Sequence, residues 1–274
     1  MTIAGEARAL SALGAGRAQP LLTGTPWRGA ALLASGFLVV AGLTRAGLLP
    51  AAATAVAAIA AVHGTLLATA VAWSDGRAFE RERTGPTLVL AAVLVIAAAA
   101  TAVHPLGAVM YVAPPLVTAV LLDPRRAVVP SRGILLVAAV FGCGLGAHIL
   151  LAASATLDHR PHVPGLTAAV AALGYDVGAN VLSAECFFRG ALFDRLQRRW
   201  SFTAAAGGST GAYLLRYGLD PLLPKTPEAL IGAAFYLGLL GVFNCWLVWR
   251  SGSILPGIVS SLLFFTAYRL LTTG

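Results

Sequence analysis

A carboxylate and a guanidinium lie four residues apart between Ala184 and Gly190, inside a long apolar run. At this spacing Glu185 and Arg189 fall on one face of a helix, where they can neutralise each other. Ionisable residues at membrane depth are costly, at about 2.5 to 3.5 kcal/mol for a central Arg or Asp on insertion scales, and they mark functional sites. We therefore interpret the pair as a candidate site. The structural alternative is an ion pair that closes the cytoplasmic end of a helix, with Arg189 extending to the headgroups.

The composition indicates a membrane protein. Of the 274 residues, 58% are hydrophobic and 11% are charged, whereas about 25% of the residues of an average soluble domain are charged. The net charge of +8 comes from basic residues that cluster at the ends of apolar runs, so we expect membrane lipids as partners and no nucleic acid.

Apolar length predicts an all-α, polytopic integral membrane helix bundle with eight or nine transmembrane helices. We expect a cytoplasmic or interfacial arm over 1–28, amino-terminal transmembrane helices over 29–163, and a core over 164–274. Glycine pairs spaced four apart allow close helix packing. The predicted spans are 29–49, 51–73, 86–103, 105–122, 133–157, 164–190, 202–218, 229–249 and 254–271.

The arginines predict the orientation. Alternate connections contain most of them, so the positive-inside rule places the amino terminus and these connections in the cytoplasm. Arginine richness with a single lysine suggests a bacterial cytoplasmic membrane. Nine spans put the carboxyl terminus outside, and eight put it inside. The arginines are Arg8, Arg17, Arg28, Arg77, Arg81, Arg83, Arg125, Arg126, Arg132, Arg195, Arg198, Arg199 and Arg250.

Two segments resemble one known family. The run from Glu185 to Gly190 resembles the first motif, Glu-Glu-x-x-Phe-Arg-Gly, of the CPBP family, the CAAX prenyl proteases and bacteriocin-processing intramembrane proteases. The stretch from Arg250 to Ile258 is similar to the short turn and helix start before that family's last motif. The similarity extends over about residues 180–270.

The resemblance implies a chemistry for the motif. In the family, a glutamate in a dry pocket acts as general base to a water molecule, and histidine and asparagine on neighbouring helices hold the water and the developing oxyanion. Glu185 and Arg189 would be the remnant of this catalytic set.

The remaining catalytic positions are substituted. The first glutamate of the motif becomes Ala184, the middle Phe and His match Tyr213 and Tyr217, and the last His and Asn fall on Ser261 and Phe265. Alanine accepts no proton, and serine and tyrosine have side-chain pKa values too high for a base near neutrality. The resemblance therefore favours a degenerate member that does not cleave peptides.

Further polar residues on the same and later helices are expected around a substrate or partner cavity, with plain helix-to-helix hydrogen bonding as the alternative for each. Asp176 lies about 13 Å along the helix from Glu185, too far to replace the missing carboxylate. The predicted cavity residues are Asp176, Asn180, Tyr213, Tyr217, Arg216, Asn244 and Ser261.

Three functions remain open. The first is a non-proteolytic protein that binds or scaffolds an integral membrane protein or peptide through its former substrate cavity. The second is an intramembrane endopeptidase that uses Glu185. The third is a small transporter or proton path that uses Asp176, Glu185, Arg189 and Arg216. The spacing of the cysteines and histidines predicts no metal site, and no cofactor is expected.

Overall fold

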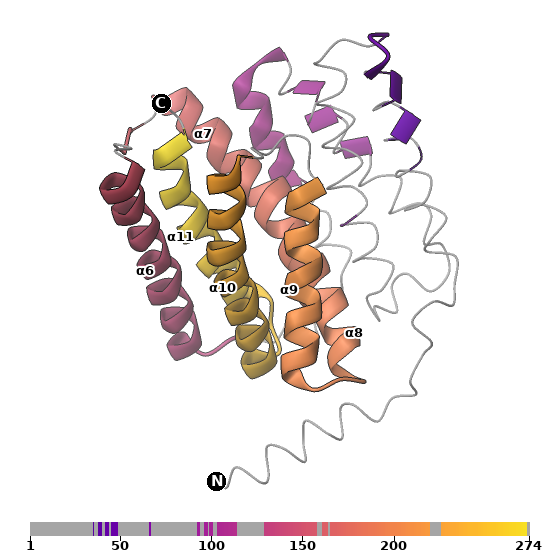
Figure 1. Cartoon of the computed structure of the whole chain (residues 1–274), viewed down its shortest axis with the longest axis vertical. Helices are drawn as coiled ribbons and strands as arrows, with labels where there is room; N and C mark the ends of the chain where they lie inside the picture. Colours follow the sequence, from indigo (N-terminus) through magenta and orange to yellow (C-terminus); the bar gives the residue numbers. More distant parts are fainter. Residues whose placement is uncertain are drawn as a thin grey trace, which may run out of the picture.

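The described part of the chain is a bundle of packed helices (Figure 1). The structure, a computed structural model, describes residues 103–113, 129–157, 161–163, 165–219 and 226–272, together with isolated positions between 35 and 100. Most of the four predicted spans before residue 123 lies outside the described residues. Within the described residues the structure is helical and contains no strand, which confirms the all-α class.

The helix bounds follow the apolar runs of the sequence closely. The short 3-10 helix η2 precedes the long helix α6. After α6, one continuous helical segment over residues 166–197 alternates between α and π geometry. The elements are η2 (Pro105–Val112), α6 (Arg132–Leu157), α7 (Leu166–Tyr175), η4 (Asp176–Leu182), η5 (Glu185–Phe193), α8 (Asp194–Gln197), α9 (Phe202–Leu219), α10 (Pro227–Ser251) and α11 (Leu255–Thr272).

Three of these helical segments are long and apolar enough to cross a membrane, namely Arg132–Thr156, Leu166–Gln197 and Leu230–Ser251. The apolar helix Leu255–Leu271 is slightly shorter. The glycines of α9 make that helix less apolar, as its sequence suggested. The described residues thus form part of an integral membrane protein, but they do not confirm the predicted eight or nine spans.

Helix α11 lies between α6 and α10, and α10 also packs on α9. Helix α9 in turn packs against η5 and α8, and η2 packs against α7. An apolar core that includes Val181, Phe188, Leu240 and Phe264 joins η4, η5, α10 and α11. This arrangement brings three segments distant in sequence, η5, α10 and α11, to one place in the interior.

Close approach of α6 and α11 depends on glycine. A Cβ atom at Gly142 would overlap backbone atoms of Ser260, and one at Gly146 would lie 2.7 Å from the Cβ of Ala267. Gly174 and Gly178 allow η2 to approach α7 and η4 in the same way. Gly207 and Gly211 on α9 are also four residues apart, but a Cβ at either position would meet no atom within 4 Å, so they provide no such contact.

The turn between α10 and α11 is closed by local polar groups. Gly252 has a φ of 67°, a left-handed conformation that favours glycine. The Ser251 hydroxyl donates to Leu247 O at 2.7 Å, and the Ser253 hydroxyl accepts from Leu255 N at 3.2 Å. These bonds satisfy backbone groups at the end of one helix and the start of the next, and so fix how α11 returns along α10.

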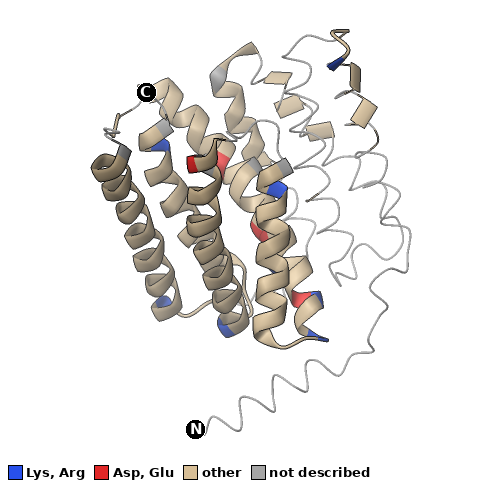
Figure 2. Cartoon of the chain, viewed as in Figure 1, with Lys and Arg blue, Asp and Glu red and all other residues tan. Residues whose placement is uncertain are grey.

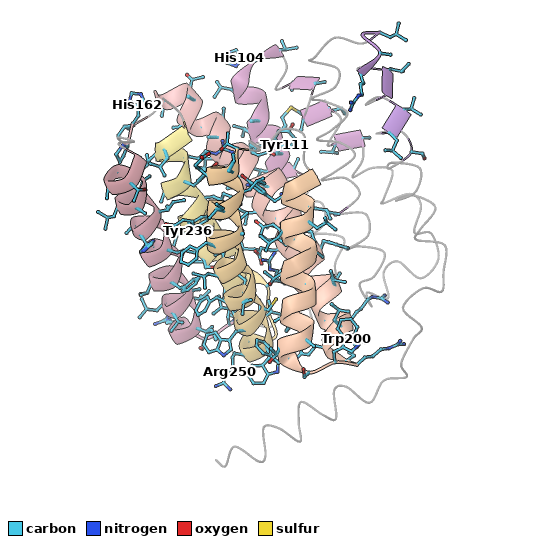
Figure 3. All side chains as sticks on the ribbon, viewed as in Figure 1. His104, Tyr111, His162, Trp200, Tyr236 and Arg250 are labelled. Carbon is cyan, nitrogen blue, oxygen red and sulfur yellow. The ribbon has the colours of Figure 1, made fainter. Side chains whose placement is uncertain are left out.

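Basic residues gather at one end of the bundle (Figure 2). Arg132 begins α6, Arg195 lies in α8, and Arg250 lies in the last turn of α10. Trp200 and Arg250 lie at this same end in Figure 3, whereas His104 and His162 lie at the opposite end. Half-exposed tryptophans beside arginines are typical of a membrane interface. The charge pattern agrees with a cytoplasmic position for this end, which remains a prediction.

The contact at Gly142 gives a direct test of the packing. We expect Gly142→Ala to lower the free energy of unfolding by about 1 to 3 kcal/mol, because the new methyl group forces α11 away from α6. Gly144→Ala is the matched control on the same helix, since no atom lies within 4 Å of its Cβ position. It should leave stability unchanged or raise it by up to about 1 kcal/mol. Unfolding by denaturing detergent, followed by circular dichroism, measures both; equal effects of the two substitutions would contradict the packing.

Candidate functional site

Glu185 and Arg189 lie on the π-helical segment η5 and are almost completely buried, at 2% and 0% exposed. Arg189 Nε lies 3.7 Å from Glu185 Oε2. Two opposite charges therefore face each other in the interior of the bundle, about 12 to 18 Å along the helix from Gln197. π-Helical turns are uncommon and occur frequently at functional sites.

Two neighbouring helices supply hydrogen bonds to the carboxylate. Asn244 Nδ2 on α10 and the Ser261 hydroxyl on α11 both donate to Glu185 Oε1, each at 2.9 Å. Asn244 Nδ2 also lies 2.8 Å from Ser261 Oγ and 3.2 Å from Gly257 O, and Asn244 Oδ1 accepts from the Ser260 hydroxyl. We refer to Glu185, Arg189, Asn244, Ser260 and Ser261 as the Glu185 cluster.

Arg189 is held mainly by its charge and by an aromatic ring. Its guanidinium carbon lies 4.4 Å from the centre of the Tyr213 ring on α9, a distance suited to a cation–π interaction. Its three nitrogens form no hydrogen bond in the described part of the chain, and neither does the nearby Thr210 hydroxyl. A buried guanidinium so poorly hydrogen-bonded depends strongly on its counter-ion.

Two residues four apart on α11, Gly257 and Ser261, face Glu185. A Cβ at Gly257 would lie 2.9 Å from Glu185 Oε2, and the Ser261 hydroxyl donates to Oε1. Phe265 instead packs in the apolar core with Phe264. Of the two positions to which the resemblance assigns the last motif, Ser261 therefore contacts Glu185 and Phe265 does not.

The other substituted positions are part of the packing. Ala184 is buried in the apolar core, so its methyl group packs against apolar side chains and not against the Glu185 carboxylate. Tyr213 stacks on Arg189, whereas Tyr217 packs at the edge of the same core. The Ser209 hydroxyl donates to Phe188 O at 2.6 Å and so joins α9 to η5.

The predicted cavity residues separate into two groups. The first group is the Glu185 cluster, which includes Asn244 and Ser261 and is contacted by Tyr213. The second group lies farther along η4 and α9 and contains Asp176, Asn180 and Arg216. Asn180 Nδ2 donates to Asp176 Oδ1 at 3.3 Å, and Arg216 Nη1 donates to Asn180 Oδ1 at 3.4 Å.

Arg269 on α11 belongs to this second group and was not predicted from the sequence. It donates through Nε and Nη2 to the two carboxylate oxygens of Asp176, at 2.9 and 3.0 Å. The sequence could have indicated this residue, because Arg269 lies at the end of a long apolar run and an arginine there needs a partner. This bidentate pair joins α11 to η4 at the end of the bundle opposite Arg250 and satisfies Asp176 with a local charge.

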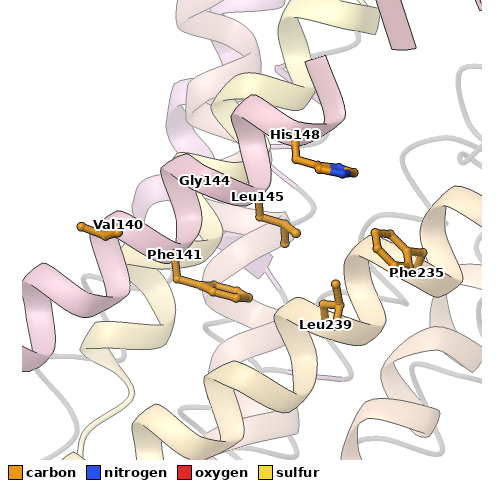
Figure 4. A pocket seen from close by; sticks show the side chains of 7 residues that line it. All are labelled: Val140, Phe141, Gly144, Leu145, His148, Phe235 and Leu239. Atoms are coloured by element: carbon orange, nitrogen blue, oxygen red, sulfur yellow. The ribbon is translucent and has the colours of Figure 1, made fainter. Parts of the chain in front are cut away.

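An open groove lies elsewhere, between α6 and α10 (Figure 4). Its volume is about 360 Å³, and no residue of the Glu185 cluster lines it. In the described residues the Glu185 cluster is therefore packed, and the lining of this groove is almost entirely apolar. The lining residues are Val140, Phe141, Gly144, Leu145, His148, Phe235 and Leu239.

Residues 166–264 match the family described as Type II CAAX prenyl endopeptidase Rce1-like. The match contains η5, α10 and most of α11, and it confirms the resemblance drawn from the sequence motifs. No curated protein and no solved structure matches the chain. Together with the apolar helices, the match describes a CAAX protease-like integral membrane protein.

The difference in burial predicts that two ion pairs of the same helical segment contribute very differently to the stability of the protein. Glu185→Gln leaves the Arg189 charge buried without its counter-ion, so we expect the free energy of unfolding to fall by about 3 to 5 kcal/mol. Asp194 and Arg198 have the same spacing and a shorter distance of 2.7 Å, but both side chains are about half exposed. Asp194→Asn should therefore change stability by less than about 1 kcal/mol, with a loss that disappears at high salt.

Unfolding titrations of the two variants in the same detergent at low and high salt make this comparison. A Glu185→Gln variant as stable as Asp194→Asn would show that the buried pair does not stabilise the bundle.

Proposed function

We propose that the protein is a non-proteolytic CAAX protease-like membrane protein that binds an integral membrane partner. The observation that supports this most strongly is the enclosure of the Glu185 carboxylate, which is 2% exposed. Oε1 accepts from Asn244 and Ser261, and Oε2 lies 3.7 Å from Arg189 Nε and accepts no hydrogen bond among the described residues. A general base must instead lie within hydrogen-bond reach of a water molecule that is placed to attack a substrate.

The position of Gly257 supports the same proposal. A side chain there would come within 2.9 Å of Glu185 Oε2 and 3.4 Å of Asn244 Cγ. Helix α11 therefore lies directly against η5 and α10 beside Glu185 Oε2. This close packing leaves little space there for a substrate or for a placed water molecule.

We place the contact with the partner on the membrane-facing surface of the same helices and not at Glu185. The sequence suggested the former substrate cavity, but the Glu185 cluster is closed among the described residues. Exposed apolar side chains such as Val140, Ile231 and Phe235 lie on α6 and α10. Packing of small and apolar side chains drives helix association in a bilayer.

A cleavage assay in lipid vesicles tests the proposal. The purified protein is incubated with a fluorogenic prenylated carboxyl-terminal peptide and with a bacteriocin leader peptide. We expect no cleavage above that of empty vesicles, for the wild type or for Glu185→Gln. Cleavage by the wild type that is lost in Glu185→Gln and retained in Asp194→Asn would establish the endopeptidase reading instead.

A transport role can be tested with the same vesicle preparation by measuring proton flux. Sealed vesicles with an internal pH indicator should show no proton flux above the lipid background, because Asp176 is bound at both oxygens by Arg269. Flux that Asp176→Asn abolishes would favour the proton-path reading over the proposal.

A further inference from the structure

The groove between α6 and α10 has one polar group in an apolar wall, the imidazole of His148. His148 is exposed on α6 and points toward the groove in Figure 4. Its Nδ1 lies 2.9 Å from the hydroxyl of Tyr236 on α10, which fixes the orientation of the ring. Among the described residues, Nε2 has no hydrogen-bond partner.

The depth of His148 limits what can occupy the groove. His148 lies about 24 Å from the start of α6 and about 14 Å from its carboxyl-terminal end, which places it inside a hydrocarbon core about 30 Å thick. Lipid headgroups do not reach this depth, and acyl chains offer no hydrogen bond to an imidazole. An occupant that satisfies Nε2 must bring its own polar group into the membrane interior.

The shape of the groove fits a helix. Gly144 forms part of its floor, and a Cβ added there would meet no atom within 4 Å, so another backbone can approach α6 closely. Phe141 and Phe235 line the groove on either side as aromatic walls. A transmembrane helix satisfies its own backbone hydrogen bonds, and one amide or hydroxyl side chain on it could bond to Nε2.

We propose that this groove binds a transmembrane helix of another protein that presents an Asn, Gln, Ser or Thr side chain at the level of His148. In the neutral imidazole one nitrogen donates and the other accepts. Whichever role Nδ1 takes toward Tyr236, Nε2 takes the other, and an amide or hydroxyl side chain can supply either partner. The inference rests on the proposed function, because it names the surface and the chemistry by which the partner would bind.

The test uses defined peptides in phosphatidylcholine vesicles that contain the full-length protein with a donor fluorophore. The probe is an acceptor-labelled Leu/Ala transmembrane peptide with one central Asn. A second peptide has Leu in place of Asn, and a third has the Asn moved by seven residues toward one end. We expect the central-Asn peptide to bind about 3- to 30-fold more tightly than either of the others.

Variants of the protein locate the site. His148→Leu should remove the preference for the central-Asn peptide, and Gly144→Leu should weaken all three peptides by filling the floor. Leu136→Ala is the matched control, because Leu136 is exposed on α6 but does not line the groove. It should leave binding unchanged.

Three results would overturn the proposal. One is equal binding of the Asn and Leu peptides, or no binding of either, as expected for a groove filled by acyl chains. Another is a preference that persists in His148→Leu. The third is energy transfer between separately labelled copies of the protein that Gly144→Leu abolishes, which would make a second copy the occupant. Cleavage of a bound peptide would contradict the proposed function without contradicting the groove, so the two failures are distinguishable.

Discussion

The buried ion pair of Glu185 and Arg189 is the constraint on which the rest of the bundle depends. The cost of removing two charges from water must be offset by their mutual attraction and by contacts with neighbouring groups. The chain supplies these from α10 and α11, through Asn244 and Ser261 on the carboxylate, and from α9, through the Tyr213 ring under the guanidinium. The polar groups therefore set the relative positions of four helical segments that apolar packing alone would leave free to slide.

The close packing of the helices around Glu185 depends on residues without large side chains. Gly257 lets α11 approach Glu185, and Gly142 lets α6 follow α11. Around Glu185 and Arg189, two further motif positions of the resemblance, Ala184 and Phe265, lie in the apolar core. The interior around the ion pair is therefore filled, and the open groove of the described residues lies between α6 and α10.

The sequence predicted the helices of the carboxyl-terminal half well, because runs of apolar residues ended by arginine, proline and glycine set helix limits directly. It also identified Glu185, Arg189, Asn244 and Ser261, since polar residues in apolar runs are conspicuous. It could not place them relative to one another. The π-helical turns of η4 and η5 change the helical register, and the rotation of α11 that turns Ser261 toward Glu185 and Phe265 toward the apolar core follows from packing between distant helices.

The central claim is that Glu185 is enclosed by protein groups, and its accessibility to a chemical probe measures this most directly. The folded protein is treated with a water-soluble carbodiimide and an amine, and the modified carboxyl groups are located by mass spectrometry. The internal standards are Asp194, whose side chain is about half exposed, and the exposed Glu228. The account predicts that both react while Glu185 remains unmodified until the protein unfolds. Modification of Glu185 in the folded protein at the rate of Asp194 and Glu228 would contradict it.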